Sequence, residues 1–153
     1  MRRKTLIILA AAGSAALLIG AFGFQYLGGL APCKLCLWQR WPHAAAVLIG
    51  AVGMALPLAP VALLGAAAAA ATTAIGVYHT GVERAWWQGP DTCTSGAISG
   101  LTPEQLMEQI LAAPLVRCDE VPWEMLGLSM ASWNAIASFA LMALWLLAAR
   151  ARA

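Results

Sequence analysis

The sequence predicts an all-α membrane protein, a four-helix transmembrane bundle with a short surface helix in its long outer loop. Of the 153 residues, 61% are hydrophobic and only 10% are charged, which leaves too few polar side chains to cover a soluble domain of this size. Four apolar stretches are long enough to cross a hydrocarbon core of about 30 Å as helices of roughly 20 residues. No internal repeat or separate soluble segment is evident, so we expect one domain over residues 1–153.

The expected spans cover residues 5–26, 38–58, 60–82 and 132–149. The first is rich in small residues, which let helices approach closely in lipid, and the six consecutive alanines of the third indicate an interior helix. Residues 1–23 also fit the pattern of a secretory signal. Their apolar run exceeds a usual signal core of about 7 to 15 residues, however, and further spans follow, so we interpret them as the first span.

The charged residues predict the orientation of the bundle. All seven acidic residues lie in the loop between the third and fourth spans. Basic residues flank the two ends of the chain: Arg2, Arg3, Lys4, Arg150 and Arg152. Because short cytoplasmic segments carry Lys and Arg, both termini are expected in the cytoplasm, although four basic residues lie on the other side. The loops 27–37 and 83–130 then lie outside the cytoplasm.

All four cysteines occur in these two outer loops. Cys33 and Cys36 lie in the first, and Cys93 and Cys118 lie in the second. Thiols confined to an oxidising compartment normally pair. A zinc site of the usual kind would have two closely spaced pairs, so we expect no metal. A structural disulfide remains open for the long-loop pair, but a bridge over two intervening residues would constrain little chain.

The stretch PCKLCLWQRWPH is expected to start the second helix, because proline suits a first helical turn. At about 100° per residue, Cys33, Cys36, Arg40 and His43 fall within about 80° of one another on the helix surface. The helix N-terminus and the Arg40 cation both favour a thiolate. The Cys-x-x-Cys pair is therefore predicted to form a readily exchanged disulfide.

Arg40 and the two histidines are the remaining candidates within the spans. An arginine inside a span needs a partner or an anionic ligand; the alternative is that Arg40 extends to the nearby membrane surface. For His43 we favour simple packing or a hydrogen bond. His79, near the outer end of the third span, has Glu83 one turn further on as a partner, and a functional and a structural role are equally open.

The long outer loop contains a predicted helix at residues 103–112 within TPEQLMEQILAAP. Thr102 is its expected N-cap, Pro103 suits the first helical position, and Gln105 completes a capping box. Pro114 is expected to end the helix. Its apolar residues share one side, as in a helix that lies on a membrane surface or one that packs against the outer ends of the spans.

In its motifs the chain resembles the DsbB family, bacterial inner-membrane oxidases that use quinone to reoxidise the periplasmic oxidant DsbA. The matching segments are PCKLCLWQR after the first span, YHTGVE at the end of the third, Cys93, and CDEVPWEMLGLSMASWN before the fourth. The resemblance implies a protein-disulfide:quinone oxidoreductase of the inner membrane with periplasmic cysteines. Its partners would be a DsbA-like thioredoxin-fold protein, ubiquinone or menaquinone, and the bilayer, with no nucleic acid.

The resemblance also implies an order for the cysteines. Reduced DsbA would attack Cys93, the partner of Cys118, and Cys118 would then exchange with Cys33. Cys36 would face the quinone as a thiolate.

Two other residues would lie at the quinone: Arg40, which would support both the thiolate and the quinone, and His79. The chain departs from the family pattern in two places. The segment between Cys93 and Cys118 is short, and Gln39 stands where some relatives have an acid, so an ion pair at that position is absent.

Two other interpretations remain open. A four-helix quinone reductase like vitamin K epoxide reductase shares the chemistry, but its Cys-x-x-Cys follows the loop cysteines, whereas here it precedes them. A structural or adaptor tetraspan protein with two inert disulfides is the other. It predicts that Cys36→Ser leaves periplasmic thiol oxidation intact.

Overall fold

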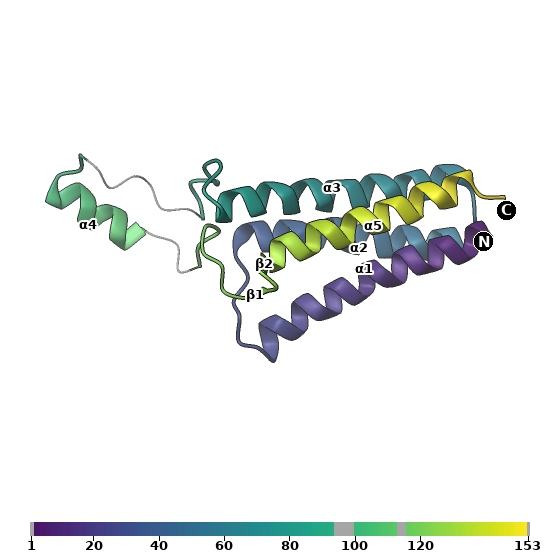
Figure 1. The fold of residues 1–153 in the computed structure, drawn as a ribbon, viewed down its shortest axis with the longest axis horizontal. Helices are drawn as coiled ribbons and strands as arrows, with labels where there is room; N and C mark the ends of the chain where they lie inside the picture. Colours follow the sequence, from purple (N-terminus) through teal and green to yellow (C-terminus); the bar gives the residue numbers. More distant parts are fainter. Residues whose placement is uncertain (1, 94–99, 113–115, 153) are drawn as a thin grey trace.

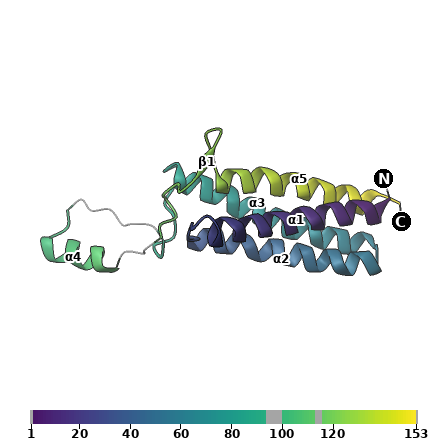
Figure 2. The same cartoon turned by 90° about the horizontal axis from the view of Figure 1, so that it is seen from below.

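The computed structural model describes residues 2–93, 100–112 and 116–152. Four long helices pack into a bundle: α1 (Arg3–Tyr26), α2 (Lys34–Ala55), α3 (Ala59–Glu83) and α5 (Met130–Arg150) (Figure 1). The predicted helical bundle is confirmed. Both termini lie at one end, and the start of α2 and the long connection from α3 to α5 lie at the other (Figures 1 and 2).

The four helices pack in a ring, with α3 against α2 and α5, and α1 against α2 and α5. Near the chain termini the core is built around the fully buried Trp145, whose indole lies directly on Gly65 of α3. A Cβ atom at position 65 would overlap this ring. Only one stripe of α3 is buried, while Leu63 and Leu64 are exposed, so α3 is not the interior helix that its alanines suggest.

Three of the long helices in the described part of the chain, α1, α3 and α5, are long and apolar enough to cross a membrane. Helix α2 carries Lys34, Gln39, Arg40 and His43 in its first half, which lowers its hydropathy. It begins before the predicted span 38–58 and ends at Ala55, because the chain turns at Leu56 ahead of Pro57.

The predicted surface helix is present as α4 (Pro103–Ala112). Its capping box is confirmed: the Thr102 N–H donates to Gln105 Oε1 at 3.0 Å, and the Gln105 N–H donates to Thr102 Oγ1 at 3.3 Å. Pro114 lies outside the described residues. In both views α4 lies apart from the long helices, so it does not pack against their outer ends. Its Met107 and Ile110 are 58% and 60% exposed, and a position on the membrane surface stays a prediction.

A small hairpin that we did not predict precedes α5. Strands β1 (Glu124–Met125) and β2 (Leu128–Ser129) pair antiparallel around Leu126 and Gly127, which both have positive φ, at 55° and 74°. A tight hairpin turn requires two residues with positive φ. Gly127 was the residue in the sequence that could have indicated this turn. Ser129 also caps α5, because its Oγ accepts the Ser132 N–H at 3.2 Å.

Arg3 links α1 to the turn between α2 and α3 and to the end of α5, where the chain termini lie. Its Nε donates to the Ala148 carbonyl at 3.1 Å, Nη1 to the Pro57 carbonyl at 3.0 Å, and Nη2 to the Ala151 carbonyl at 2.6 Å. Carbonyls at and beyond helix C-termini lack partners within the helix and attract cations. Arg3 therefore stabilises the bundle in addition to any influence on orientation.

We expect Arg3→Ala to lower the free energy of unfolding by about 1 to 3 kcal/mol, because three carbonyls lose a charged donor. Thermal unfolding of the purified protein in detergent micelles measures the change. Lys4→Ala is the matched control, since Lys4 carries the same charge and is exposed. Equal unfolding midpoints for the two variants would show that the Arg3 contacts contribute nothing.

Candidate functional site

The four cysteines come together at the outer end of the bundle. Cys33, Cys93 and Cys118 are buried in one cluster, and Cys36 packs against it. Cys93 and Cys118 form a disulfide with a Cα–Cα distance of 5.3 Å, and the Cys118 N–H donates to the Cys93 carbonyl at 2.7 Å. The sulfurs of Cys33 and Cys36 are 2.9 Å apart and unbonded. The short pair and the long-loop pair are thus neighbours.

The start of α2 shapes the short pair. Cys33 is the N-cap of α2, and its sulfur accepts the Cys36 N–H at 3.2 Å. The Cys33 thiol donates to the Cys36 sulfur; this hydrogen bond and burial raise the pKa of Cys33, while the N–H of Cys36 opposes them. In the dithiol form Cys33 therefore keeps its proton and Cys36 is the acceptor.

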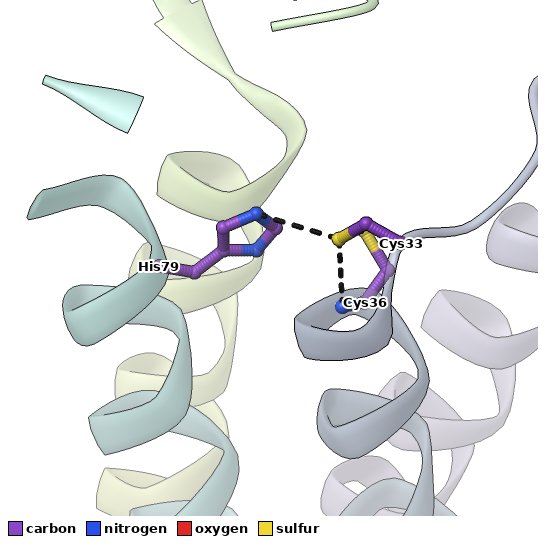
Figure 3. Close-up of side chains that lie close together, drawn as sticks. All are labelled: Cys33, Cys36 and His79. Carbon is purple, nitrogen blue, oxygen red and sulfur yellow. Dashed lines mark hydrogen bonds between the residues drawn. The ribbon is translucent and has the colours of Figure 1, made fainter. Parts of the chain in front are cut away.

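His79 of α3 lies beside the short pair, facing the start of α2. Figure 3 shows its ring directed at Cys33, with 3.6 Å between Nε2 and the Cys33 sulfur. His79 is only 3% exposed. The sequence predicted a position near the outer end of the third span, and the structure places the ring in contact with Cys33.

Glu83 is the predicted partner of His79, and this contact is confirmed at 3.8 Å between His79 Nε2 and Glu83 Oε1. The other carboxylate oxygen of Glu83 accepts the hydroxyl of Ser129, which the unpredicted hairpin carries to this point. The side chains of His79 and Glu83 are each 4% exposed. The buried Glu83 carboxylate thus lies close to the short cysteine pair. The sequence suggested Glu83 only as a partner of His79 and not as a residue of the site.

Arg40 is held by α1. Its Nη1 donates to Gln25 Oε1 at 2.5 Å, its Nη2 donates to the Ala21 carbonyl at 3.2 Å, and the guanidinium lies 4.8 Å from the centre of the Phe22 ring. The side chain is partly buried, so it does not simply extend to the surface. Among the described residues, its hydrogen bonds go to α1 and none joins it to Cys36.

A cavity of about 380 Å³ adjoins the cysteines. Cys36, Arg40, His79 and Glu83 form part of its wall, and the rest is mostly apolar, with contributions from α1 and α5. This volume lies in the range of sites for small organic molecules, which combine an apolar wall with a few placed polar groups. The cavity borders the short cysteine pair, so a ligand in it would lie next to the sulfurs.

Comparison with known proteins connects this arrangement to one family. The family model described as disulfide bond formation protein DsbB matches residues 3–148. The chain belongs to the DsbB family. Disulfide bond formation protein B of Stutzerimonas stutzeri is 29% identical and aligns over 96% of each chain. The protein of the same name from Methylococcus capsulatus is 32% identical over 85% of this chain and 84% of its own, and that from Azoarcus sp. is 30% identical over 97% and 94%.

No solved structure matches the chain. Membership of the DsbB family makes this a multi-pass membrane oxidoreductase involved in disulfide bond formation. The predicted family and its general role are therefore confirmed.

The sequence analysis missed one group of residues in this DsbB protein. Gln39, noted only as a departure from the family pattern, donates to His79 Nδ1 at 2.8 Å and accepts from Asn134 Nδ2 at 2.7 Å. His43, 3% exposed, lies 2.9 Å from Asn134 Oδ1, as its expected packing role implies. These residues could have been identified as polar residues within apolar spans. Such groups are costly in a membrane unless they are hydrogen-bonded, so they are expected to contact one another.

Proposed function

We propose that the protein reoxidises a periplasmic DsbA-like dithiol oxidant and passes the electrons to ubiquinone, with menaquinone as the alternative acceptor. It acts as a protein-disulfide:quinone oxidoreductase that sustains disulfide formation in periplasmic proteins. The observation that supports this most is the burial of both cysteine pairs in one cluster beside a cavity that also contains Arg40 and His79.

The cysteines act as a relay of disulfide exchanges. A thiolate of the reduced partner attacks the Cys93 sulfur, the bond to Cys118 breaks, and its electron pair leaves on Cys118. The Cys118 thiolate attacks Cys33 of the Cys33–Cys36 disulfide, which leaves Cys36 as a thiolate. The second thiol of the partner then displaces Cys93, and the partner departs with its own disulfide formed.

The freed Cys93 thiolate attacks Cys118 and restores the Cys93–Cys118 bond, which releases Cys33 as a thiol beside Cys36. The partner's two electrons now reside on the short pair. The arrangement of a Cys93–Cys118 disulfide with Cys33 and Cys36 as thiols corresponds to this stage. Oxidation of Cys33 and Cys36 back to a disulfide completes the cycle and releases two electrons and two protons.

The cavity suits a quinone ring, which would supply a two-electron acceptor next to Cys36. Arg40 would hold the ring, since it lines the cavity and carries several hydrogen-bond donors, and His79 would border the ring beside Cys33. Glu83 lies next to His79 and can hold a proton at its carboxylate.

The proposed orientation places both termini in the cytoplasm and the cysteines in the periplasm. The basic ends of the chain lie together, and the acid-rich outer loop leaves the opposite end of the bundle. An even number of crossings by α1, α2, α3 and α5 is consistent with this arrangement. We propose the whole chain as one such domain, with spans close to those predicted.

The function is tested by mixing the purified protein with a reduced DsbA-like dithiol protein and a soluble ubiquinone analogue. Quinone absorbance should fall with catalytic kinetics, and the dithiol partner should be recovered as the disulfide. A boiled sample and a sample without partner are the controls. An absence of quinone reduction by correctly folded protein would refute the proposal.

The order of the relay gives a separate prediction. In Cys118→Ser the mixed disulfide between the partner and Cys93 cannot be passed inward, so it should accumulate and be visible on a non-reducing gel. The matched variant Cys93→Ser should show no such species at Cys118. A trapped complex formed only through Cys33 would reverse the assignment of the two pairs.

A further inference from the structure

A chain of hydrogen bonds links the two histidines of the protein; Gln39 and both histidines are buried, and Asn134 is half-buried. It runs from His79 on α3 through Gln39 on α2 and Asn134 on α5 to His43 on α2. Gln39 is 6% exposed and both histidines are 3% exposed. Groups this deep in an apolar bundle are ordered by their partners and not by water.

Two backbone carbonyls determine the direction of every bond in this chain. Gln39 Nε2 lies 3.3 Å from the Leu35 carbonyl oxygen, which can only accept, so the Gln39 amide must present its nitrogen there. The Thr72 hydroxyl donates its proton to the backbone carbonyl of Gln39 at 3.2 Å. Its oxygen therefore accepts the hydrogen bond from Asn134 Nδ2, at 3.1 Å. A flip of either amide would bring two acceptors face to face.

The tautomer of His79 follows from this direction. The same Gln39 Nε2 that faces the Leu35 carbonyl also lies 2.8 Å from His79 Nδ1, so Nδ1 must accept a hydrogen bond. A neutral imidazole carries one N–H, which then resides on Nε2. Nε2 is the atom that faces the Cys33 sulfur at 3.6 Å and Glu83 at 3.8 Å.

We propose that Gln39 is a positioning residue that holds His79 in the Nε2–H tautomer, so that His79 donates a hydrogen bond to the Cys33 sulfur. In this state His79 is neither a base toward Cys33 nor a metal ligand. The functional meaning of this inference rests on the proposed redox role of the Cys33–Cys36 pair, but the tautomer itself does not.

The consequence is largest for metal ions. The sulfurs of Cys33 and Cys36 and a ring nitrogen of His79 lie within 4.8 Å of one another, which is the donor set of a soft metal site. A histidine that binds zinc through Nε2 must carry its proton on Nδ1 and donate it to an acceptor. Gln39 presents a donor at that point. The dithiol form is thereby protected from capture by zinc.

The same reasoning applies to proton transfer. A free Nε2 lone pair beside a thiol would form a thiolate–imidazolium pair, as in cysteine–histidine catalytic sites. With the proton already on Nε2, His79 cannot take the proton of Cys33. The Cys33 thiol therefore keeps its proton and donates it in the hydrogen bond to the Cys36 sulfur.

The tautomer is measured directly in the reduced, full-length wild-type protein in detergent micelles. Two-bond ¹H–¹⁵N correlations of ¹⁵N-histidine-labelled protein distinguish Nε2–H from Nδ1–H. The chain has two histidines. The signal set that disappears in His79→Asn belongs to His79, and the set that remains belongs to His43. We expect His79 as Nε2–H; a proton on Nδ1 in the wild type would overturn the inference.

Zinc affinity tests the role of Gln39. Gln39→Glu presents an acceptor to Nδ1, so the reduced variant should bind zinc at least about tenfold more tightly than the reduced wild type, the effect expected of a supporting carboxylate. Competition with a colorimetric zinc chelator gives the affinity. Gln25→Glu adds the same charge beside Arg40 without contact to His79 and should match the wild type.

A third variant separates the hydrogen bond from the charge. Gln39→Met removes the donor without adding an acceptor, and His79 should then populate both tautomers. Equal zinc affinity in Gln39→Glu and the wild type, or an unchanged tautomer in Gln39→Met, would overturn the role of Gln39. None of these measurements needs quinone or a partner protein, so their outcome is independent of the test of catalysis.

Discussion

Cys36→Ser is expected to abolish electron transfer to quinone, with a loss of at least about 10³-fold in kcat, as for other residues that act as a catalytic unit. A serine hydroxyl cannot form a disulfide with Cys33. Electrons that arrive from the loop pair then have no second sulfur through which to leave. The effect is on turnover and not on affinity, because Cys36 forms only part of the cavity wall.

Two measurements identify the blocked step in this variant. Quinone absorbance should stay constant under conditions in which the wild type turns over, while the partner should still form a mixed disulfide at Cys93. Leu37→Ser, at the exposed neighbouring position of α2, is the matched control and should retain turnover. If Cys36→Ser still supports periplasmic thiol oxidation in cells, the protein is the tetraspan with inert disulfides.

Arg40→Ala is expected to raise the KM for quinone by about 10- to 100-fold with a smaller change in kcat, since hydrogen bonds to charged groups contribute about 1.5 to 3 kcal/mol. The guanidinium lines the cavity and is oriented by Gln25 and the Ala21 carbonyl. Its loss removes a donor for the quinone and the link between α2 and the last turn of α1. Both effects weaken the binding site.

Initial rates at varied quinone concentration separate these contributions. Arg40→Lys keeps the charge but cannot make both hydrogen bonds, so its KM should fall between those of the wild type and Arg40→Ala. Lys34→Ala is the charge control, because Lys34 is exposed and contacts Thr92 and Trp38 at the surface. If Arg40→Ala leaves the quinone dependence unchanged, the role of Arg40 is limited to anchoring α1.

Local features of the fold were predictable wherever neighbouring residues decide them. The capping box of Thr102 and Gln105 was predicted because a capping contact spans only about three residues. The pairing of His79 with Glu83 follows equally from helical spacing. The expectation that Pro32 lies in the first turn of α2 was wrong, because Cys33 is the N-cap and Pro32 precedes it. The hairpin at residues 124–129 was missed because its two-residue strands are too short to produce an alternating pattern.

Contacts between elements were predicted less well. The interior position expected of α3 was wrong, since four helices packed in a ring leave an outward face on each. The expected support of the thiolate by Arg40 stays a prediction, and the hydrogen bonds of Arg40 to α1 were not predicted. Gln39 was the most informative omission, because its neighbours in space come from α3 and α5 and not from its own helix.

The sequence by itself determined the helical membrane bundle, the start of α2 at the Cys-x-x-Cys motif, the family and the candidate redox residues. Each depends on composition or on residues close together in the chain. Only the tertiary structure decided that both cysteine pairs share one cluster and that Gln39 and Asn134 connect the histidines. The physical reason is that in lipid the buried and exposed faces of a helix are both apolar, so hydropathy does not reveal which faces meet.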